Sequence, residues 1–169
     1  MTFLAARSSR PRLFGLALFA SFIVVGVDQA SKWFMAAVVM DPPRVIPVTP
    51  FFNLVLGFNP GISFGLLSDL GSSGPVALSV LTLAIIAFLV LWLWRTQDIL
   101  EASALGLIIG GAAGNLIDRL RDGAVTDFLD FYVGQYHWPT FNLADVAISL
   151  GVGMILIGSF LISKQTKKF

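Results

Sequence analysis

The sequence contains no cysteine and only one histidine, His137, in 169 residues. The lack of cysteine excludes a disulfide framework, a thiolate metal site and a cysteine nucleophile. A single histidine also disfavours a histidine-based metal site and a Ser-His-Asp triad. Among the groups that remain, a pair of aspartates is the catalytic centre that this composition favours.

Charged residues are scarce too. They make up 12% of the chain, against about 25% in a typical soluble domain, while 56% of the residues are hydrophobic. A soluble fold needs a charged surface that this chain cannot supply, so we expect an integral membrane protein. The net charge of +1 lacks the excess of cations that nucleic-acid binding requires, so no nucleic-acid partner is expected.

The scarce charges are separated by four long apolar runs. Crossing a bilayer takes about 20 helical residues, and backbone in lipid must form helices or a closed barrel. The runs do not alternate as barrel strands would. We therefore predict one integral-membrane domain over 1–169, an all-α four-transmembrane-helix bundle with helices at about 13–39, 73–95, 100–119 and 143–163.

The expected orientation follows from the cations at the helix ends. We expect the first run to be kept as a helix, because Asp28 stands where a small residue would precede a signal-peptide cleavage site. Clustered cations mark the cytoplasmic side, and the outer side is not free of them (Lys32, Arg44, Arg119, Arg121). The cations that fall on one common side, with both termini, are Arg7, Arg10, Arg12, Arg95, Lys164, Lys167 and Lys168.

Two segments, 41–72 and 120–142, then lie outside the cytoplasmic membrane. Prolines 42, 43, 47 and 50 oppose a helix at the start of the first segment. The alternation of Phe52, Leu54, Leu56 and Phe58 predicts a short strand with one apolar face. The stretch "GISFGLLSDL" at 61–70 has the pattern of an amphipathic helix on the membrane surface.

This topology brings four aspartates from separate parts of the sequence to one depth. Asp28 and Asp118 come near the outer ends of the first and third helices, Asp145 starts the fourth, and Asp127 lies in the outer segment between. Ionisable groups in or beside a membrane span are costly, which makes them candidates for function.

Simpler roles remain open for several of these residues. Asp28 and Lys32 share a helix face and form either a local ion pair or part of a site. Asp118 with Arg119 either anchors a helix end or supports the site, and Asn142 with Asp145 has capping-box spacing. Asp122 and Asp130 are expected to face water. Close helix packing is expected where small residues recur at Gly106, Gly110 and Gly114.

A close carboxylate pair shares one proton, so one member can take a proton from water while the other donates one to a carbonyl oxygen. This chemistry hydrolyses a peptide bond without a covalent intermediate. An interfacial aspartyl hydrolase and a small proton-coupled transporter with an aspartate relay both fit the pattern. A lipid-modifying enzyme or a structural subunit is a further alternative, and the pattern does not choose which aspartates pair.

Four motifs decide between these alternatives by resemblance. They are "DQASK" at 28–32, "NPGISFGLL" at 59–67, "GGAAGNLIDRLRDGAVTDFLDF" at 110–131 and "FNLADVAISLG" at 141–151. In order and spacing the chain resembles the lipoprotein signal peptidases, or type II signal peptidases, which are bacterial membrane aspartyl enzymes. The resemblance spans about three quarters of the chain.

The resemblance implies a role for each matching residue. Asp127 and Asp145 would be the catalytic pair. Positions that shape the site or hold substrate would be Asp28, Lys32, Asn59, Gly61, Asn115, Asp118, Arg119 and Asn142. The 41–72 segment would form a small extracytoplasmic β-cradle with a short surface helix.

The resemblance also implies a substrate and a location. The enzyme would cut the signal peptide of diacylglyceryl-modified prolipoproteins just before the lipidated cysteine, with the lipid between helices in the membrane. It would be a multi-pass protein of the bacterial inner membrane with its active site near the outer face. The resemblance implies no metal or organic cofactor. Globomycin, a peptide mimic, would inhibit the enzyme, and we expect a monomer because one chain holds the whole site.

Overall fold

The computed structural model describes residues 10–61 and 74–166. Within these ranges, four helices are long and apolar enough to cross a membrane, which confirms the prediction from hydropathy. The first helix continues into a short π-helical turn, η1. The bounds are α1 Arg10–Phe34, η1 Met35–Val39, α2 Gly74–Arg95, α3 Ile99–Asp122 and α4 Leu143–Thr166.

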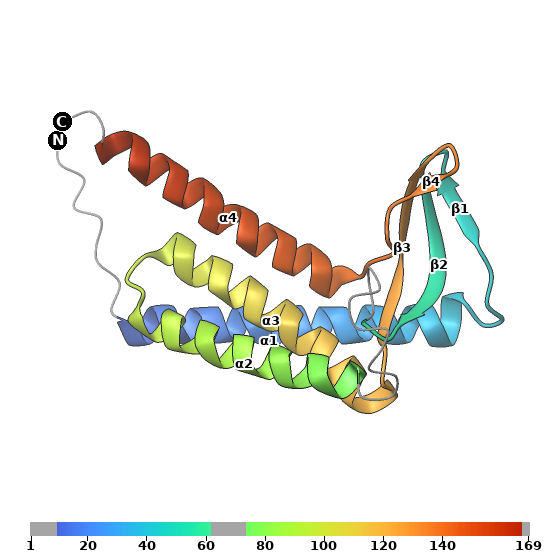
Figure 1. Ribbon diagram of the computed structural model, residues 1–169, viewed down its shortest axis with the longest axis horizontal. Helices are drawn as coiled ribbons and strands as arrows, with labels where there is room; N and C mark the ends of the chain where they lie inside the picture. The colour runs from blue at the N-terminus through green and yellow to red at the C-terminus, as the bar shows by residue number, and fades with distance from the viewer. Residues whose placement is uncertain (1–9, 62–73, 167–169) are drawn as a thin grey trace.

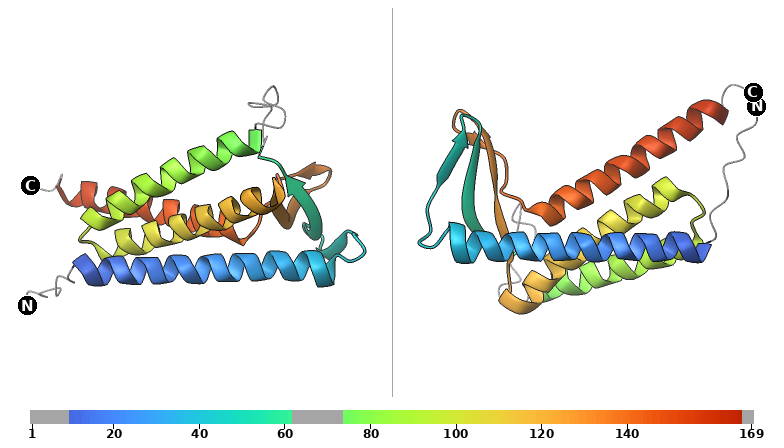
Figure 2. Two further views of the ribbon diagram at one scale, coloured as in Figure 1. Left: turned by 90° about the horizontal axis from the view of Figure 1, so that it is seen from below. Right: turned by 180° about the vertical axis from the view of Figure 1, so that it is seen from behind.

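Helix α3 is the central element of the bundle. It contacts α1, α2 and α4, and it lies between α1 and α2 in the left view of Figure 2. Two thirds (67%) of its most apolar window is buried, against 17 to 22% for the other three helices. The other helices therefore leave most of their apolar surface for lipid, as expected in a bilayer.

Glycines let the helices approach α3 closely. A Cβ atom at Gly106 would lie 2.7 Å from the Ala17 carbonyl oxygen of α1, and one at Gly110 would lie 2.8 Å from that of Ser21. Gly151 of α4 faces the Ala104 carbonyl oxygen in the same way, at 2.6 Å. These contacts confirm the packing expected from the small-residue spacing.

Both ends of α3 carry capping groups. The Asp98 carboxylate accepts a hydrogen bond from the Glu101 amide at 2.9 Å, a side-chain N-cap. Gly123 ends the helix in the left-handed conformation, with φ of 73° and its amide bonded to the Arg119 carbonyl. The helix therefore runs to Asp122, past the end expected near 119.

A four-stranded antiparallel sheet completes the fold, in the order β1-β2-β3-β4. Strand β2 is the strand predicted from the alternation of apolar residues. Strand β3 was not predicted, and it brings segment 120–142 into the same sheet as segment 41–72. The bounds are β1 Ile46–Thr49, β2 Phe52–Asn59, β3 Val125–Val133 and β4 Tyr136–His137.

The sheet stands at one end of the helices, and α1 begins and α4 ends at the opposite end (Figure 1). The last turns of α1 and α3 and the first turn of α4 all meet the sheet there. The amphipathic stretch expected at 61–70 lies outside the described residues apart from Gly61.

Candidate active site

Three charged side chains form a buried cluster between α1 and α3. Lys32 Nζ lies 2.8 Å from Asp28 Oδ2 and 2.8 Å from Asp118 Oδ2. All three residues are at most 2% exposed. Asp28 and Lys32 do form a local ion pair within α1. Lys32 also pairs with Asp118, 86 positions further on in α3, so the cluster ties the two helices together.

The carboxylate oxygens of this cluster also accept hydrogen bonds from other residues. Asp28 Oδ1 accepts from the Ala144 amide at 2.9 Å, and Asp118 Oδ2 accepts from the Thr126 amide at 3.1 Å. Gln29 Nε2 donates to Asp118 Oδ1 at 2.7 Å. The cluster thereby fixes the start of α4 and the start of β3 relative to α1 and α3. Asp118 itself is fully buried in this cluster.

Asn115 connects the charged cluster to Asp145. Lys32 Nζ donates to Asn115 Oδ1 at 2.9 Å, which sets the orientation of the amide. Asn115 Nδ2 must then face away from the lysine, and it donates to Asp145 Oδ1 at 2.8 Å. The buried lysine therefore controls the position of the Asp145 carboxylate through one intermediate residue.

Asn142 connects Asp145 to Asp127. Its Oδ1 accepts from the Asp145 amide at 3.1 Å, and its own amide donates to Asp145 Oδ2 at 3.2 Å, which confirms the predicted capping box. Its Nδ2 donates to Asp127 Oδ1 at 2.7 Å and to Asn115 Oδ1 at 3.2 Å. One buried side chain thus caps α4 and holds both aspartates in a single network.

Asp127 is the third residue of β3 and is 2% exposed. Asn59 of β2 donates to its Oδ2 at 3.3 Å. Burial raises the pKa of Asp127 from 3.8 to about 6, and the negative charge of Asp145 adds to this effect. Hydrogen bonds from Asn142 and Asn59 act in the opposite direction, as does the charge of Lys32. This carboxyl group therefore holds a proton more readily than an ordinary aspartate.

Arg119 brings a positive charge to the same place. Its Nε is buried without a hydrogen-bond partner in the described part of the chain, while its Nη1 is 3.5 Å from the Asn115 carbonyl. Its charge interacts with Asp145, Asp118 and Asp127. Within the described residues, the guanidinium thus retains a buried donor that is not used in the fold.

Gly61 follows β2 in the left-handed conformation, with φ of 88°. Its amide donates to Asn59 Oδ1 at 2.8 Å, which turns Asn59 Nδ2 toward Asp127. A Cβ at Gly61 would lie 3.5 Å from Arg119 Nε. The residue therefore suits a tight turn that brings backbone close to the arginine.

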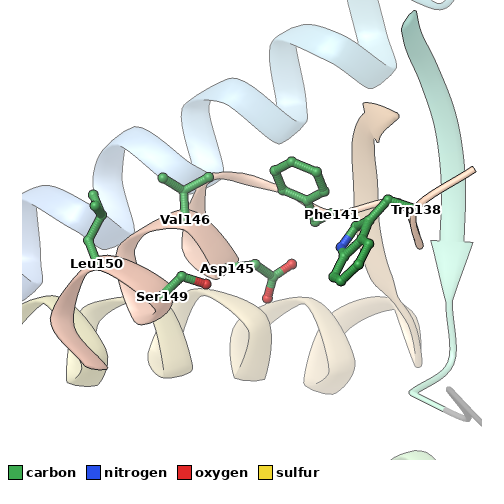
Figure 3. A pocket seen from close by; sticks show the side chains of 6 residues that line it. All are labelled: Trp138, Phe141, Asp145, Val146, Ser149 and Leu150. Carbon is green, nitrogen blue, oxygen red and sulfur yellow. The ribbon is translucent and has the colours of Figure 1, made fainter. Parts of the chain in front are cut away.

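A pocket of about 410 Å³ opens beside Asp145, between the first turns of α4 and the segment that follows β4. Figure 3 shows the Asp145 carboxylate between Trp138 on the sheet side and Ser149 on the helix side. The other lining residues are Phe141, Val146 and Leu150. The described residues therefore give a substrate access to this carboxylate.

The expectation that both Asp122 and Asp130 face water is correct for Asp122 and wrong for Asp130. Asp122 is exposed and pairs with Arg121 at 2.7 Å. Asp130 is only 4% exposed, because Asn53 donates to its Oδ2 at 3.0 Å and His137 Nδ1 lies 2.8 Å from its Oδ1. Burial acts to raise the pKa of Asp130, but these hydrogen bonds and the charge of His137 outweigh it and lower the pKa.

Sequence reasoning missed two residues of the network. Gln29 bridges Asp28, Asp118 and the Gly114 carbonyl. Gly114 makes room for the Asp28 carboxylate, since a Cβ there would lie 3.2 Å from its Cγ. The signal for Gly114 was the small-residue spacing, which predicted packing, whereas Gln29 gave no signal beyond its place next to Asp28.

Comparison with known proteins identifies the family. The family model for signal peptidase (SPase) II matches residues 20–161. The chain belongs to the signal peptidase II family. The lipoprotein signal peptidase of Methylocella silvestris is 46% identical over 150 residues, which are 88% of this chain and 86% of that protein. That of Beijerinckia indica subsp. indica is 43% identical over 142 residues, or 83% and 85% of the two chains.

Solved structures agree with this assignment. A bacterial membrane enzyme solved by the in meso method at 2.3 Å resolution is 30% identical, with a TM-score of 0.76 over 92% of each chain. The protein is therefore a membrane signal peptidase of the type II family. The transporter alternative finds no support in these comparisons.

Proposed function

We propose that this signal peptidase is an aspartic endopeptidase with Asp127 and Asp145 as its catalytic pair. Its substrates would be diacylglyceryl-modified prolipoproteins, cut just before the lipidated cysteine. The observation that carries the proposal is the single hydrogen-bonded network that holds both carboxylates through Asn142, with Asp145 open to a pocket. Membership of the signal peptidase II family supports the substrate class.

In the proposed reaction, the two carboxyl groups share one proton. The raised pKa of Asp127 supports its role as the member that keeps the proton and donates it to the carbonyl oxygen of the scissile bond. Asp145, ionised, takes a proton from a water molecule, whose oxygen attacks the carbonyl carbon. The tetrahedral intermediate collapses as the carbon–nitrogen bond breaks. The leaving amine of the cysteine receives the proton from Asp145, and Asp127 recovers its proton from the hydroxyl group that becomes the new carbonyl oxygen.

The other site residues would position this chemistry. Lys32, Asp28 and Asp118 hold Asn115, which orients Asp145. The free donors of Arg119 are suited to a substrate carbonyl. Asn59, fixed by Gly61, supports Asp127 from the sheet.

The same proposal places the sheet on the outer side of the bacterial inner membrane. Both termini and the link between α2 and α3, which carries Arg95, would be cytoplasmic. Single-domain organisation and a monomeric state are part of the proposal, because one chain supplies the whole network. Membrane lipid would surround the helices, and globomycin-type peptide mimics would compete with substrate.

The proposal is tested with a lipidated prolipoprotein in detergent micelles, followed by gel shift. Asp127→Asn and Asp145→Asn should each lower turnover by about 10³-fold, the order of magnitude of acid–base catalysis. Both asparagines are close in size to aspartate and should leave expression and thermal stability intact. Asp122→Asn, an exposed aspartate at the end of α3, is the matched control and should cleave at the wild-type rate.

Substantial turnover in either site variant would overturn the catalytic assignment. Loss of turnover in a stable Asp118→Asn variant, with activity kept in Asp127→Asn, would show that the pair has been assigned to the wrong residues. Inhibition by globomycin in the same assay would support the substrate class.

A further inference from the structure

The pocket beside Asp145 has a wall that no part of the proposed mechanism uses. The indole ring of Trp138 stands on its sheet side, and Trp138 is 70% exposed. An aromatic side chain so exposed contributes little to the core, yet it faces the carboxylate across the pocket (Figure 3). Its position beside Asp145 is therefore suited to contact with a substrate.

Trp138 is held in place by the strand before it. Its backbone amide donates to the Phe131 carbonyl at 2.8 Å. The neighbouring residue, His137, stacks on Tyr132 with ring centroids 5.0 Å apart and bonds to Asp130, which is in turn bonded by Asn53. Consecutive residues of an extended chain point to opposite faces. His137 can therefore be tied to one face of the sheet while Trp138 projects from the other.

The pocket lining next to Trp138 is also held in place. Phe141 stacks on Phe131 with centroids 5.9 Å apart, so the pocket floor next to Trp138 is aromatic and ordered. Val146, Ser149 and Leu150 continue the lining along α4, inside its candidate membrane span Leu143–Phe160. The pocket thus runs from the sheet, past Asp145, to bilayer depth.

The direction in which the pocket runs indicates where each part of a substrate would lie. A signal peptide lies in the membrane, so the chain before the cleaved bond belongs on the Leu150 side of Asp145. The residues after the lipidated cysteine leave the membrane, so they belong on the Trp138 side. From this geometry we infer that Trp138 is a specificity-determining residue that contacts the side chain following the lipidated cysteine, and that His137 is its positioning residue.

The inference rests on the proposed function, and it predicts a preference for apolar and aromatic side chains at that substrate position. A pocket of about 410 Å³ admits a bulky side chain, and an indole ring favours contact with another aromatic ring. A pair of lipidated prolipoproteins that differ only in phenylalanine or serine after the cysteine provides the test. In the wild type, kcat/KM should be about five-fold higher for the phenylalanine substrate, mainly through KM.

Trp138→Ala should bring the ratio of the two kcat/KM values to about one, and Trp138→Phe should retain part of the preference. His137→Gln should lower the ratio less than Trp138→Ala does, because it loosens the indole ring of Trp138 without removing it. Tyr136→Ala is the matched control: Tyr136 is 86% exposed on β4, the two-residue strand just before Trp138, but is not among the residues that line the pocket, so the wild-type ratio should persist.

A general loss of structure would lower both rates together and leave the ratio unchanged, so the ratio isolates the contact. Equal kcat/KM values in the wild type, or a ratio that survives Trp138→Ala, would overturn the inference while leaving the proposed function intact. If the wild type cleaves neither substrate, the proposed function fails and the inference fails with it.

Discussion

At Asp127, burial and hydrogen bonding act on the same pKa in opposite directions. Burial and the charge of Asp145 prevail and raise the pKa to about 6, while Asn142 and Asn59 stabilise the ionised form. If Asp127 donates the proton in catalysis, the free enzyme must hold that proton to react. The environment of one residue therefore predicts how activity depends on pH.

We expect kcat/KM to fall as pH rises through about 6, because Asp127 is ionised above this pH and has no proton to donate. Asn59→Ala removes a hydrogen bond that favours the ionised form, so the pKa should rise and the fall should move to higher pH. Asn53→Ala is the matched control, since Asn53 is an asparagine of the same strand that bonds Asp130 instead. Steady-state kinetics between pH 4 and 9 would measure the shift.

A fall that stays in place in Asn59→Ala, or moves to lower pH, would contradict the role of Asp127 as proton donor. A rate that rises through pH 6 would assign the donor role to Asp145 instead.

Residue-scale prediction from the sequence succeeded where the signal was local. The spacing of Asn142 and Asp145 predicted the capping box, and the spacing of Asp28 and Lys32 gave their ion pair as one of two alternatives. The prediction that Asp130 faces water was wrong, because the groups that allow its burial include Asn53, which lies 77 positions away in the sequence. The choice of Asp127 and Asp145 among the aspartates came from family resemblance, since no local pattern distinguishes them.

At the scale of elements, the helices were predictable because hydropathy acts along the chain, whereas β3 was not. The sequence of β3 has no strict alternation of apolar and polar residues, and its aspartates are buried by partners on β2, on β4 and at the residue just before α4. Its strand conformation depends on pairing with β2, where Gly57 lies opposite Asp127 beside an irregularity in register. Such pairing is a tertiary property.

Close contact between α1 and α3 gives a prediction at this scale. Gly110→Ala would place a methyl group 2.8 Å from the Ser21 carbonyl oxygen and should lower the free energy of unfolding by about 1–3 kcal/mol, as overpacking does. Gly26→Ala on α1 is the matched control, because nothing lies within 4 Å of a Cβ there. Thermal unfolding in detergent micelles would compare the two variants.

Separation of the helices should also loosen the bond between Lys32 and Asn115, so turnover should fall in Gly110→Ala but not in Gly26→Ala. Equal stability of the two variants would contradict the packing described for α3.

At the scale of the whole molecule, the charges and the sheet divide the protein into two ends. The helix ends opposite the sheet carry Arg10, Arg12 and Arg95 (Figure 1). The natural absence of cysteine makes this arrangement easy to probe, because any introduced thiol is the only one in the protein.

Tyr136→Cys on the sheet should react with a membrane-impermeant maleimide added to intact spheroplasts, whereas Gln97→Cys between α2 and α3 should react only after the membrane is dissolved. Both positions are exposed, so a difference in labelling reports their side of the membrane. The opposite labelling pattern would invert the proposed orientation.

The bond between Asp28 and the Ala144 amide has a consequence for synthesis of the chain. It joins the first helix to the last across 116 positions, so a nascent chain presents Asp28 and Lys32 to the insertion machinery long before their later partners exist. At that stage their mutual 2.8 Å contact partly neutralises both charges as the first helix enters the bilayer. If Asp127 and Asp145 are the catalytic pair, as proposed above, a chain released before residue 145 lacks one of the two carboxylates, so proteolytic activity can appear only when translation is nearly complete.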